Sequence, residues 1–128
     1  MSDERPEPGT IGWIDLTVEN ADEVKEFYAQ VVGWKPEEVP MGSYSDYNMT
    51  LPETGTPATG VCHRKGTNEA APTGWMIYVN VAHIDESVAK VLELGGKVVM
   101  EPRDMGAMGR FCMIEDPSGA ACALFEPA

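Results

Sequence analysis

The feature that most constrains this chain is an internal repeat that runs through nearly all of its length. A strand, a helix and three further strands are predicted in the first half, and the same order recurs in the second half. Val18 at the end of the first strand corresponds to Val81, and the helix-ending Gly33 corresponds to Gly96. Both pairs are about 63 residues apart. The fold is therefore expected to contain two copies of one supersecondary unit.

The first half opens with a strand over residues 11–18 whose side chains alternate between two faces. Ile14, Leu16 and Val18 form an apolar face that is typical of a core. Trp13, Asp15 and Thr17 form the opposite face, which combines an aromatic ring, a carboxylate and a hydroxyl. The second face is the kind of surface that holds a ligand.

A helix follows this strand and is bounded by clear start and stop residues. Asn20 is a good N-cap, and Glu23 completes a pattern similar to a capping box. Apolar residues then recur at helical spacing until Gly33 ends the helix. Three short strands are predicted after it, over residues 34–39, 44–51 and 58–63. Alternation alone does not decide which face of the second of these carries Tyr44, Tyr47 and Asn48.

The second half repeats this order. A strand is predicted over residues 75–81, a helix from about Asp85 to the Gly95-Gly96 pair, and strands over residues 97–101, 110–115 and 120–125. The sequence Asp116-Pro117-Ser118-Gly119 before the last strand is a strong β-turn signal.

The predicted domain organisation follows from these elements. Each half has one helix, which can cover only one face of a small sheet, so the other two faces must be buried against each other. We expect a flexible N-terminal tail over residues 1–9 and a single domain over residues 10–127. Within it, module one covers about 10–64, a linker 65–74, and module two about 75–127.

Composition limits the partners of the chain. The 21 acidic and 9 basic residues give a net charge of −12, whereas nucleic acids and anionic membrane surfaces attract basic proteins. No nucleic acid or membrane partner is therefore expected. The acidic N-terminus lacks the apolar core of a signal peptide, and no run approaches the 18 apolar residues of a membrane span. Cys62, Cys112 and Cys122 show no disulfide-framework spacing, which favours a reducing, cytoplasmic location.

Several stretches, in this order along the chain, resemble one known family. They are Trp13-Ile14-Asp15-Leu16 before a helix with Phe27-Tyr28 and the end Gly33-Trp34, then Ala58-Thr59-Gly60-Val61, and Met108-Gly109-Arg110-Phe111 leading to Asp116-Pro117-Ser118-Gly119-Ala120. Together with the duplication, they are similar over about residues 8–127 to the vicinal oxygen chelate superfamily. This superfamily includes glyoxalase I, the bleomycin-resistance proteins and extradiol dioxygenases. The resemblance is greatest to the glyoxalase-like branch with tryptophan at the start of the first strand.

The resemblance implies an α+β fold in which two βαβββ modules form a cupped eight-stranded mixed sheet with the helices on its outer face. Metal-using relatives hold their ion in the cup with His, Gln or Glu, one from the first and one from the last strand of each module. The matching positions here are Trp13, about Gly60, Met76 and Ala123. These side chains cannot supply the nitrogen, oxygen or sulfur donors of a transition-metal site, so no metal and no cofactor are expected.

The ligand-binding residues are expected on the inner faces of the two first strands and the last strand. They are Trp13, Asp15, Thr17, Met76, Tyr78, Asn80, Ala123 and Phe125. Asp15 is the best candidate for a catalytic group, because a carboxylate with a raised pKa can act as a general base. Beside Trp13 it could also bind a cation, and the alternative is a structural Asp15 tied to Arg110 or to a backbone amide.

The two histidines receive different interpretations. His83 follows the first strand of module two, where it is expected to serve as a cap or to lie in solvent. His63 ends a strand beside Arg64-Lys65 and is expected at the surface, with ligand contact as the alternative.

We therefore expect a metal-free protein that binds a small organic molecule, cationic or aromatic, in the cup between the modules. The family's antibiotic-sequestering members bind in the cleft of a dimer, so a homodimer is expected here. The alternatives are a metal- or carboxylate-dependent lyase, isomerase or dioxygenase, and an interaction module whose cup is filled by its own side chains. The sequence does not identify the ligand and does not decide whether the chain is an enzyme.

Overall fold

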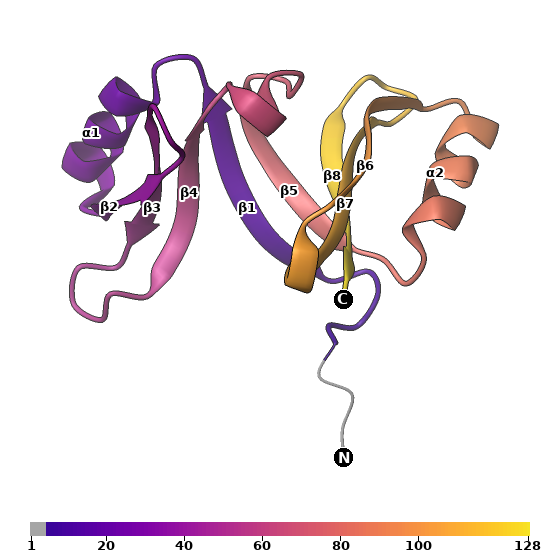
Figure 1. The fold of residues 1–128 in the computed structure, drawn as a ribbon, viewed down its shortest axis with the longest axis horizontal. Helices are drawn as coiled ribbons and strands as arrows, with labels where there is room; N and C mark the ends of the chain where they lie inside the picture. The colour runs from indigo at the N-terminus through magenta and orange to yellow at the C-terminus, as the bar shows by residue number, and fades with distance from the viewer. Residues whose placement is uncertain (1–4) are drawn as a thin grey trace. The chain divides into compact units, whose positions relative to one another are not determined.

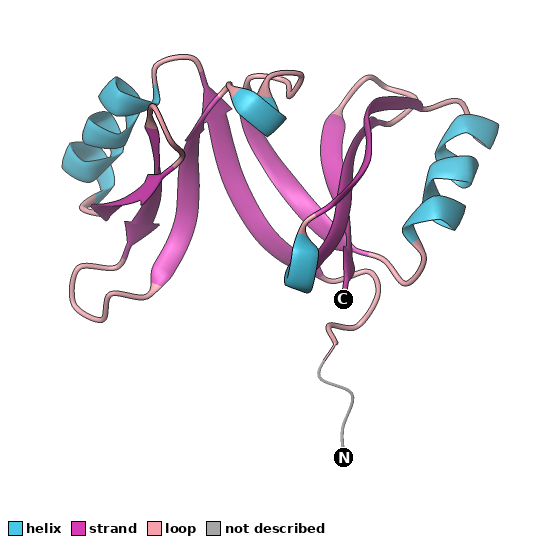
Figure 2. Cartoon of the chain, viewed as in Figure 1, coloured by secondary structure: helices cyan, strands magenta, loops and turns pink. Residues whose placement is uncertain are grey.

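The structure is a computed structural model that describes residues 5–128, apart from the side chain of Thr67. Its elements follow the predicted order (Figures 1 and 2): β1 (Ile11–Val18), α1 (Ala21–Val32), β2 (Lys35–Pro40), β3 (Ser45–Thr50), β4 (Pro57–His63), β5 (Gly74–Asn80), α2 (Ile84–Glu93), β6 (Lys97–Asp104), β7 (Gly109–Glu115) and β8 (Ala121–Pro127). The eight strands form a mixed sheet, and the predicted α+β class with one helix in each half is confirmed.

Contacts along the chain define two compact units. The module-one unit is Ile14–Trp75, and the module-two unit joins the segment ending at Trp13 to Met76–Ala128. The division falls inside β1, between Trp13 and Ile14.

In the module-one unit the strand order is β2-β3-β4-β1. Strand β1 pairs with β4 in parallel, with Leu16 opposite Val61, while β3 is antiparallel to both of its neighbours. Helix α1 covers one face of these strands (Figure 1), and the core there contains Leu16, Ala21, Tyr47, Met49 and Val61. The predicted core face of β1 is thus correct for Leu16 and for Val18, which packs against this cluster.

Ile14 is the exception on that face. The alternation of β1 placed it in the core, but 42% of its surface is exposed. This part of the prediction is wrong, because alternation identifies the face of a strand and does not show how far the covering helix reaches along it.

The ends of α1 show one difference from the predicted capping pattern. Gly33 ends the helix with a φ of 90°, and its backbone N–H donates to Ala29, as a glycine C-cap should. At the start, however, the Asn20 side chain caps no backbone N–H, and its amide instead donates to the Glu23 carboxylate at 3.1 Å. The predicted residue pair is present, but its bond joins two side chains.

In the module-two unit the strand order is β5-β8-β7-β6. Strand β5 pairs with β8 in parallel, with Tyr78 opposite Ala123, and β7 is antiparallel to β8 and β6. Helix α2 packs over one face, where Ile84, Cys112, Ile114 and Leu124 form the buried cluster.

Two contacts hold the start of α2. His83 precedes the helix and is exposed without capping it, so the expected solvent position is confirmed. The cap comes from β8, where the Glu126 carboxylate accepts the Ile84 backbone N–H at 2.8 Å. Arg110 of β7 pairs with Asp85 at 3.0 Å.

The predicted tail and linker both show ordered contacts in the part of the chain that the structure describes. Residues 1–4 of the tail lie outside the described range. Arg5 donates to the Pro127 carbonyl at 3.2 Å, and the Gly9 N–H donates to the Asn80 carbonyl at 2.7 Å. The expected linker 65–74 contains a short 3₁₀ turn at Gly66–Asn68 (Figure 2). Among residues 5–128, neither α-helix has the length and apolar character that crossing a bilayer requires.

Candidate functional site

Each module has a sheet face opposite its helix, which we call the helix-free face. In module one this face carries Asp15 and Thr17 of β1, Asn48 of β3, and Gly60 and Cys62 of β4, because the strand register aligns them. Asp15 lies opposite Gly60, and Thr17 lies opposite Cys62. The register also answers the question about β3: Asn48 is on the helix-free face, and Tyr47 is on the helix side.

Asp15 and Thr17 are both buried, with exposed fractions of 9% and 4%. A Cβ added at Gly60 would lie 3.5 Å from the Asp15 Cβ and 3.9 Å from the Cys62 Sγ, so these three residues are close neighbours. Burial raises the pKa of the Cys62 thiol to about 12, and the carboxylates of Asp15 and Asp46 add to this effect. Arg110, one of the structural partners expected for Asp15, pairs with Asp85 at 3.0 Å.

The helix-free face of module two is apolar. The register of β5 with β8, together with the alternation along β5, places five of the expected ligand-binding residues on it: Met76, Tyr78, Asn80, Ala123 and Phe125. Adjoining strands add Phe111 and Met113 of β7 and Met100 of β6.

Thioethers and aromatic rings dominate this surface. Met76, Met100, Met113 and Ala123 are at most 4% exposed, whereas Tyr78 and Phe125 are half-buried. The rings of Tyr78 and Phe111 lie 6.3 Å apart and are tilted by 39°. The face therefore consists of a buried methionine floor with partly accessible aromatic side chains.

Asn80 has a structural role on this face. Its side-chain amide donates to the Thr10 hydroxyl at 3.1 Å, and its backbone N–H donates to the Thr10 carbonyl at 2.8 Å. A Cβ at Gly12 would lie 2.8 Å from the Asn80 amide nitrogen, so any side chain there would have to displace this amide. Trp13, the remaining expected residue, is half-buried and belongs by its contacts to the same unit.

The positions at which metal-using relatives hold their ion do not fit a metal. Trp13, Gly60 and Ala123 supply no donor atom, and Met76 supplies only a thioether that is buried in the methionine floor. Within residues 5–128 no group of three or more His, Cys, Asp or Glu side chains has the arrangement of a metal site.

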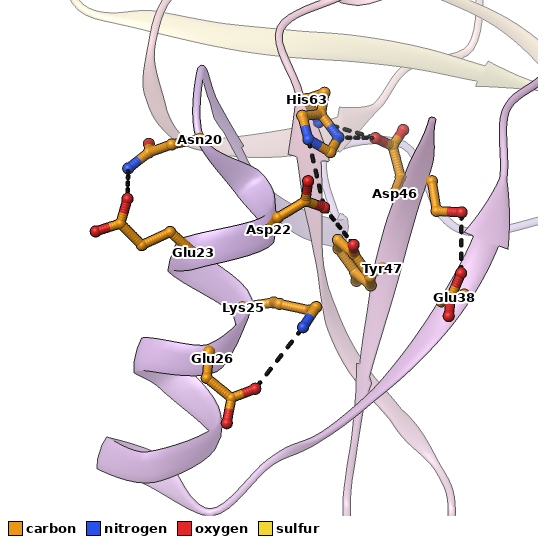
Figure 3. Close-up of polar contacts among 10 residues, drawn as sticks. Asn20, Asp22, Glu23, Lys25, Glu26, Glu38, Asp46, Tyr47 and His63 are labelled. Carbon is orange, nitrogen blue, oxygen red and sulfur yellow. Dashed lines mark hydrogen bonds and ion pairs between the residues drawn. The ribbon is translucent and has the colours of Figure 1, made fainter. Parts of the chain in front are cut away.

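A polar cluster in module one was missed by the sequence analysis (Figure 3). His63 is only 4% exposed, so its expected surface position is wrong. Its Nδ1 lies 3.4 Å from the Asp46 carboxylate, and its Nε2 lies 3.6 Å from that of Asp22. The rings of Tyr44 and Tyr47 lie 5.3 and 6.5 Å from the imidazole. This cluster ties the first turn of α1 to strands β3 and β4.

The electrostatics of this cluster centre on one hydrogen bond. The Tyr47 hydroxyl donates to the Asp22 carboxylate, which lowers the pKa of Asp22 and raises the pKa of Tyr47 to about 12. The Asp46 carboxylate also accepts the backbone N–H of His63 at 2.8 Å. His63 Nδ1 is nevertheless buried without a hydrogen-bond partner among the described residues, although the Asp46 carboxylate lies 3.4 Å away. The contacts that are made link α1 to β3 and β4, which favours a structural role for the cluster.

A signal for this cluster was present in the sequence. Asp22 lies in the first turn of α1, while Tyr47 and His63 lie in strands that turn their alternate side chains toward this helix. The strand register was needed to bring them together, because the turns before β3 and β4 set that register and alternation does not.

Comparison with known proteins identifies relatives over nearly the whole chain. Residues 10–124 match the sequence model of the Glyoxalase/Bleomycin resistance protein/Dioxygenase superfamily. The chain is 34% identical over 119 residues to the putative glyoxylase CFP32 of Mycobacterium bovis, covering 92% of this chain and 46% of that protein. It is 29% identical to the anthracycline biosynthesis protein DauV of Streptomyces sp. strain C5, covering 93% and 42%. The chain thus spans less than half the length of these curated relatives.

Solved structures share the fold at lower identity. A superfamily member from Vibrio splendidus 12B01 matches with a TM-score of 0.58 at 17% identity, covering 93% of this chain and 100% of the other. Methylmalonyl-CoA epimerase from Mycobacterium tuberculosis matches with a TM-score of 0.55 at 18% identity, covering 94% and 88%.

Proposed function

Because this chain belongs to the Glyoxalase/Bleomycin resistance protein/Dioxygenase superfamily, we propose that it binds a small organic molecule without a metal ion. The binding surface in this proposal is the helix-free face of module two. The observation that carries it is the methionine floor of that face, flanked by Tyr78 and Phe125. It includes Met76 and adjoins Ala123, two of the positions that match the ligand positions of metal-using relatives.

The chemistry of this face favours an aromatic ligand. Methionine side chains adapt their shape and make favourable contacts with aromatic rings, and a half-buried Tyr or Phe can stack on a planar molecule. Small-molecule sites are commonly apolar with few polar groups. A relative named for anthracycline biosynthesis supports the choice of an anthracycline, a planar and cationic compound, as the first probe.

Calorimetric titration with an anthracycline tests this proposal. We expect saturable binding, unchanged after dialysis against EDTA, and less than stoichiometric transition metal in the purified protein by elemental analysis. Tyr78→Ala and Phe125→Ala should each weaken binding about fivefold, since an aromatic contact contributes about 1 kcal/mol.

The matched control is Leu92→Ala, which removes an exposed apolar side chain from α2, on the helix side of the same module. It should leave the affinity unchanged. Stoichiometric metal whose removal abolishes binding would contradict the metal-free proposal. Equal affinity of Tyr78→Ala, Phe125→Ala and wild type would exclude this face as the binding surface.

A carboxylate-dependent lyase or isomerase is the second candidate, and Asp15 is the residue that favours it. Its carboxylate is buried on the helix-free face of module one, opposite a glycine that adds no side-chain bulk. A general base in this position would catalyse deuterium exchange into a carbon acid such as a hemithioacetal. Exchange that is lost in Asp15→Asn would support this candidate, and its absence in the wild-type protein would exclude it for that substrate.

A further inference from the structure

The helix side of module two contains a groove that the side chains of the module do not fill. It has a volume of about 740 Å³, which suits a small molecule, and it runs along one flank of α2. We call it the α2 groove. Its lining belongs entirely to the module-two unit, and it lies on the opposite side of the sheet from Tyr78 and Phe125. The α2 groove is therefore separate from the binding surface proposed above.

The floor of the α2 groove is aliphatic. Ile114 and Leu124 are 9% and 8% exposed and belong to the buried cluster beneath α2, against which Val81 and Val91 pack. Among the described residues that line the groove there is no Phe, Tyr, Trp or Met. This surface thus lacks the rings and thioethers of the helix-free face, and it favours a saturated hydrocarbon over a planar aromatic molecule.

Small residues leave the groove open. Ala82 precedes α2, Ser87 and Ala89 lie within the helix, and all three line the groove. Pro117, in the turn between β7 and β8, lines it as well. Short side chains along this flank of α2 leave space above the floor, so a bulky side chain at Ser87 would occupy part of the groove.

The charges around the α2 groove favour a cation. Glu86, Glu93 and Asp116 bring carboxylates to its lining, whereas Lys90 is the one lysine or arginine among the described residues there. Lys90 is already paired with Glu93 at 3.7 Å. Glu115 also lines the groove, but alternation along β7 turns its side chain toward the helix-free face. The net charge of −12 on the chain adds to the attraction of a cation.

The C-terminal end of α2 is the place for the positive charge. Lys97, which does not line the groove, follows four residues after Glu93 and pairs with Glu115 across β6 and β7. Asp116 therefore lies near the same end of the helix as Glu93. Hydrogen bonds from the hydroxyl and the backbone N–H of Ser118 lower the pKa of Asp116, so its carboxylate is charged at neutral pH. The dipole of a helix also attracts cations to its C-terminal end.

We propose that the α2 groove binds a small aliphatic amine. The hydrocarbon body lies on the floor between Val81 and Ile114, and the ammonium group lies at the C-terminal end of α2, near Glu93 and Asp116. The proposal does not depend on the proposed aromatic ligand, because the two surfaces lie on opposite sides of the sheet.

A titration with octylammonium chloride, followed in proton–nitrogen correlation NMR spectra, tests this proposal. We expect saturable shifts of the backbone amide signals of Ser87, Lys90 and Asp116, and no shift at Tyr78 on the helix-free face. Octan-1-ol and octanoate have the same hydrocarbon chain without the positive charge. Octan-1-ol should bind about fivefold more weakly than octylammonium, and octanoate more weakly still.

Two matched variants test the location of the site. Ser87→Phe and Leu92→Phe both place a ring on α2, but Ser87 lines the groove, whereas Leu92 is 60% exposed and does not line it. Ser87→Phe should weaken octylammonium binding about tenfold, because the ring occupies the space of the hydrocarbon chain. Leu92→Phe should leave the affinity unchanged. Circular dichroism checks that both variants keep the fold.

A second pair of variants tests the charge. Glu93 and Glu26 each lie 3.7 Å from a lysine, and their side chains are 62% and 61% exposed, so Glu93→Gln and Glu26→Gln are equivalent changes on different modules. Glu93→Gln should weaken octylammonium binding about threefold, and Glu26→Gln should not. Lys90→Gln should strengthen binding by a similar factor, since it removes a positive charge from the lining.

Three results would overturn the proposal. The first is the absence of saturable shifts around α2 with octylammonium, or shifts of equal size at Tyr78. The second is equal affinity for octylammonium, octan-1-ol and octanoate, which would exclude a cation site. The third is equal affinity of Ser87→Phe and Leu92→Phe. If Ser87→Phe does not fold, equal affinity of Glu93→Gln and Glu26→Gln takes its place as the excluding result.

Discussion

Cys62 shows how the environment of one residue controls its reactivity. The thiol is partly buried on the helix-free face of module one, and burial together with the carboxylates of Asp15 and Asp46 raises its pKa to about 12. Only the thiolate is a nucleophile. Relative to a cysteine with the ordinary pKa of 9.0, this pKa lowers the thiolate fraction at neutral pH about 1,000-fold.

We therefore expect Cys62 to resist alkylation by iodoacetamide at pH 8 in the folded protein. Mass spectrometry of the peptide that contains it would show almost no modification over a time in which a free thiol reacts completely. Protein unfolded in urea is the control and should be modified at Cys62, Cys112 and Cys122. Rapid labelling of folded Cys62 would contradict the assigned environment.

Tyr47 gives a second prediction at the level of a single residue. Its hydroxyl donates to the Asp22 carboxylate, so Tyr47→Phe removes this bond and keeps the buried ring. We expect the melting temperature at pH 7 to fall by about 3 °C, measured by circular dichroism.

The pH dependence of this loss has a definite sign. The pKa of Tyr47 is raised from 10.0 to about 12, so its neutral form stabilises the fold below pH 10 and this contribution is lost between pH 10 and 12. The difference between wild type and Tyr47→Phe should shrink over that range. A constant difference up to pH 12 would show that the bond is absent in solution.

At the scale of elements, α2 depends on a cap from a distant strand. The backbone N–H of Ile84, at the first position of the helix, donates to the Glu126 carboxylate of β8. An unsatisfied N–H would remain after Glu126→Ala, because Ile84 is fully buried and the His83 side chain does not cap the helix. We expect this change to lower the free energy of unfolding by about 1 kcal/mol in urea titrations.

Glu126→Gln is the matched control, because its amide oxygen can accept the same hydrogen bond. It should keep most of the stability. If Glu126→Gln and Glu126→Ala cost the same, the effect comes from the charge of Glu126 and not from the cap.

The prediction of elements from sequence was successful where a local signal sufficed. Alternation located β1 and β5, and Gly33 ended α1 through its left-handed conformation. The repeat predicted the order of strands and helices in both halves. These predictions were correct because each feature depends on residues that are close in the sequence.

The errors concern burial, which depends on residues far apart in the chain. His63 was expected at the surface because it ends a strand beside two basic residues, and the first turn of α1 covers it. Ile14 was expected in the core because of its alternation, and 42% of its surface is exposed. Of the expected site residues, Asn80 bonds to Thr10, and no local sequence pattern predicts a contact between residues so far apart.

For the molecule as a whole, the lowered pKa values of three carboxylates lead us to expect a loss of stability in acid. The pKa values of Asp22, Asp85 and Asp116 are all lowered from 3.8, by hydrogen bonds from Tyr47, Arg110 and Ser118 respectively. A lowered pKa contributes stability above the unfolded value, and this stability is lost as the pH falls below it.

We expect the urea midpoint to fall as the pH is lowered from about 5 to about 2, because these carboxylates become protonated. Repulsion within a chain of net charge −12 also weakens in that range and acts in the opposite direction, so a control is needed. The triple variant with Asn at the three positions separates the two effects. It should be less stable at pH 6 and should lose less stability in acid, and parallel curves for both proteins would contradict the assignment.

The hydrogen bonds between Thr10 and Asn80 determine where the chain can be cut to produce the two modules as separate proteins. The repeat in the sequence suggests a cut near residue 70. However, Asn80 bonds to Gly9 and Thr10, so the start of the chain belongs to module two. A fragment beginning at residue 75 would lack Thr10 and leave the buried Asn80 amide without that acceptor. The boundary between the sequence repeats is therefore the wrong place to separate the modules, and a module-two protein would need residues 5–13 joined back to it, for example by circular permutation.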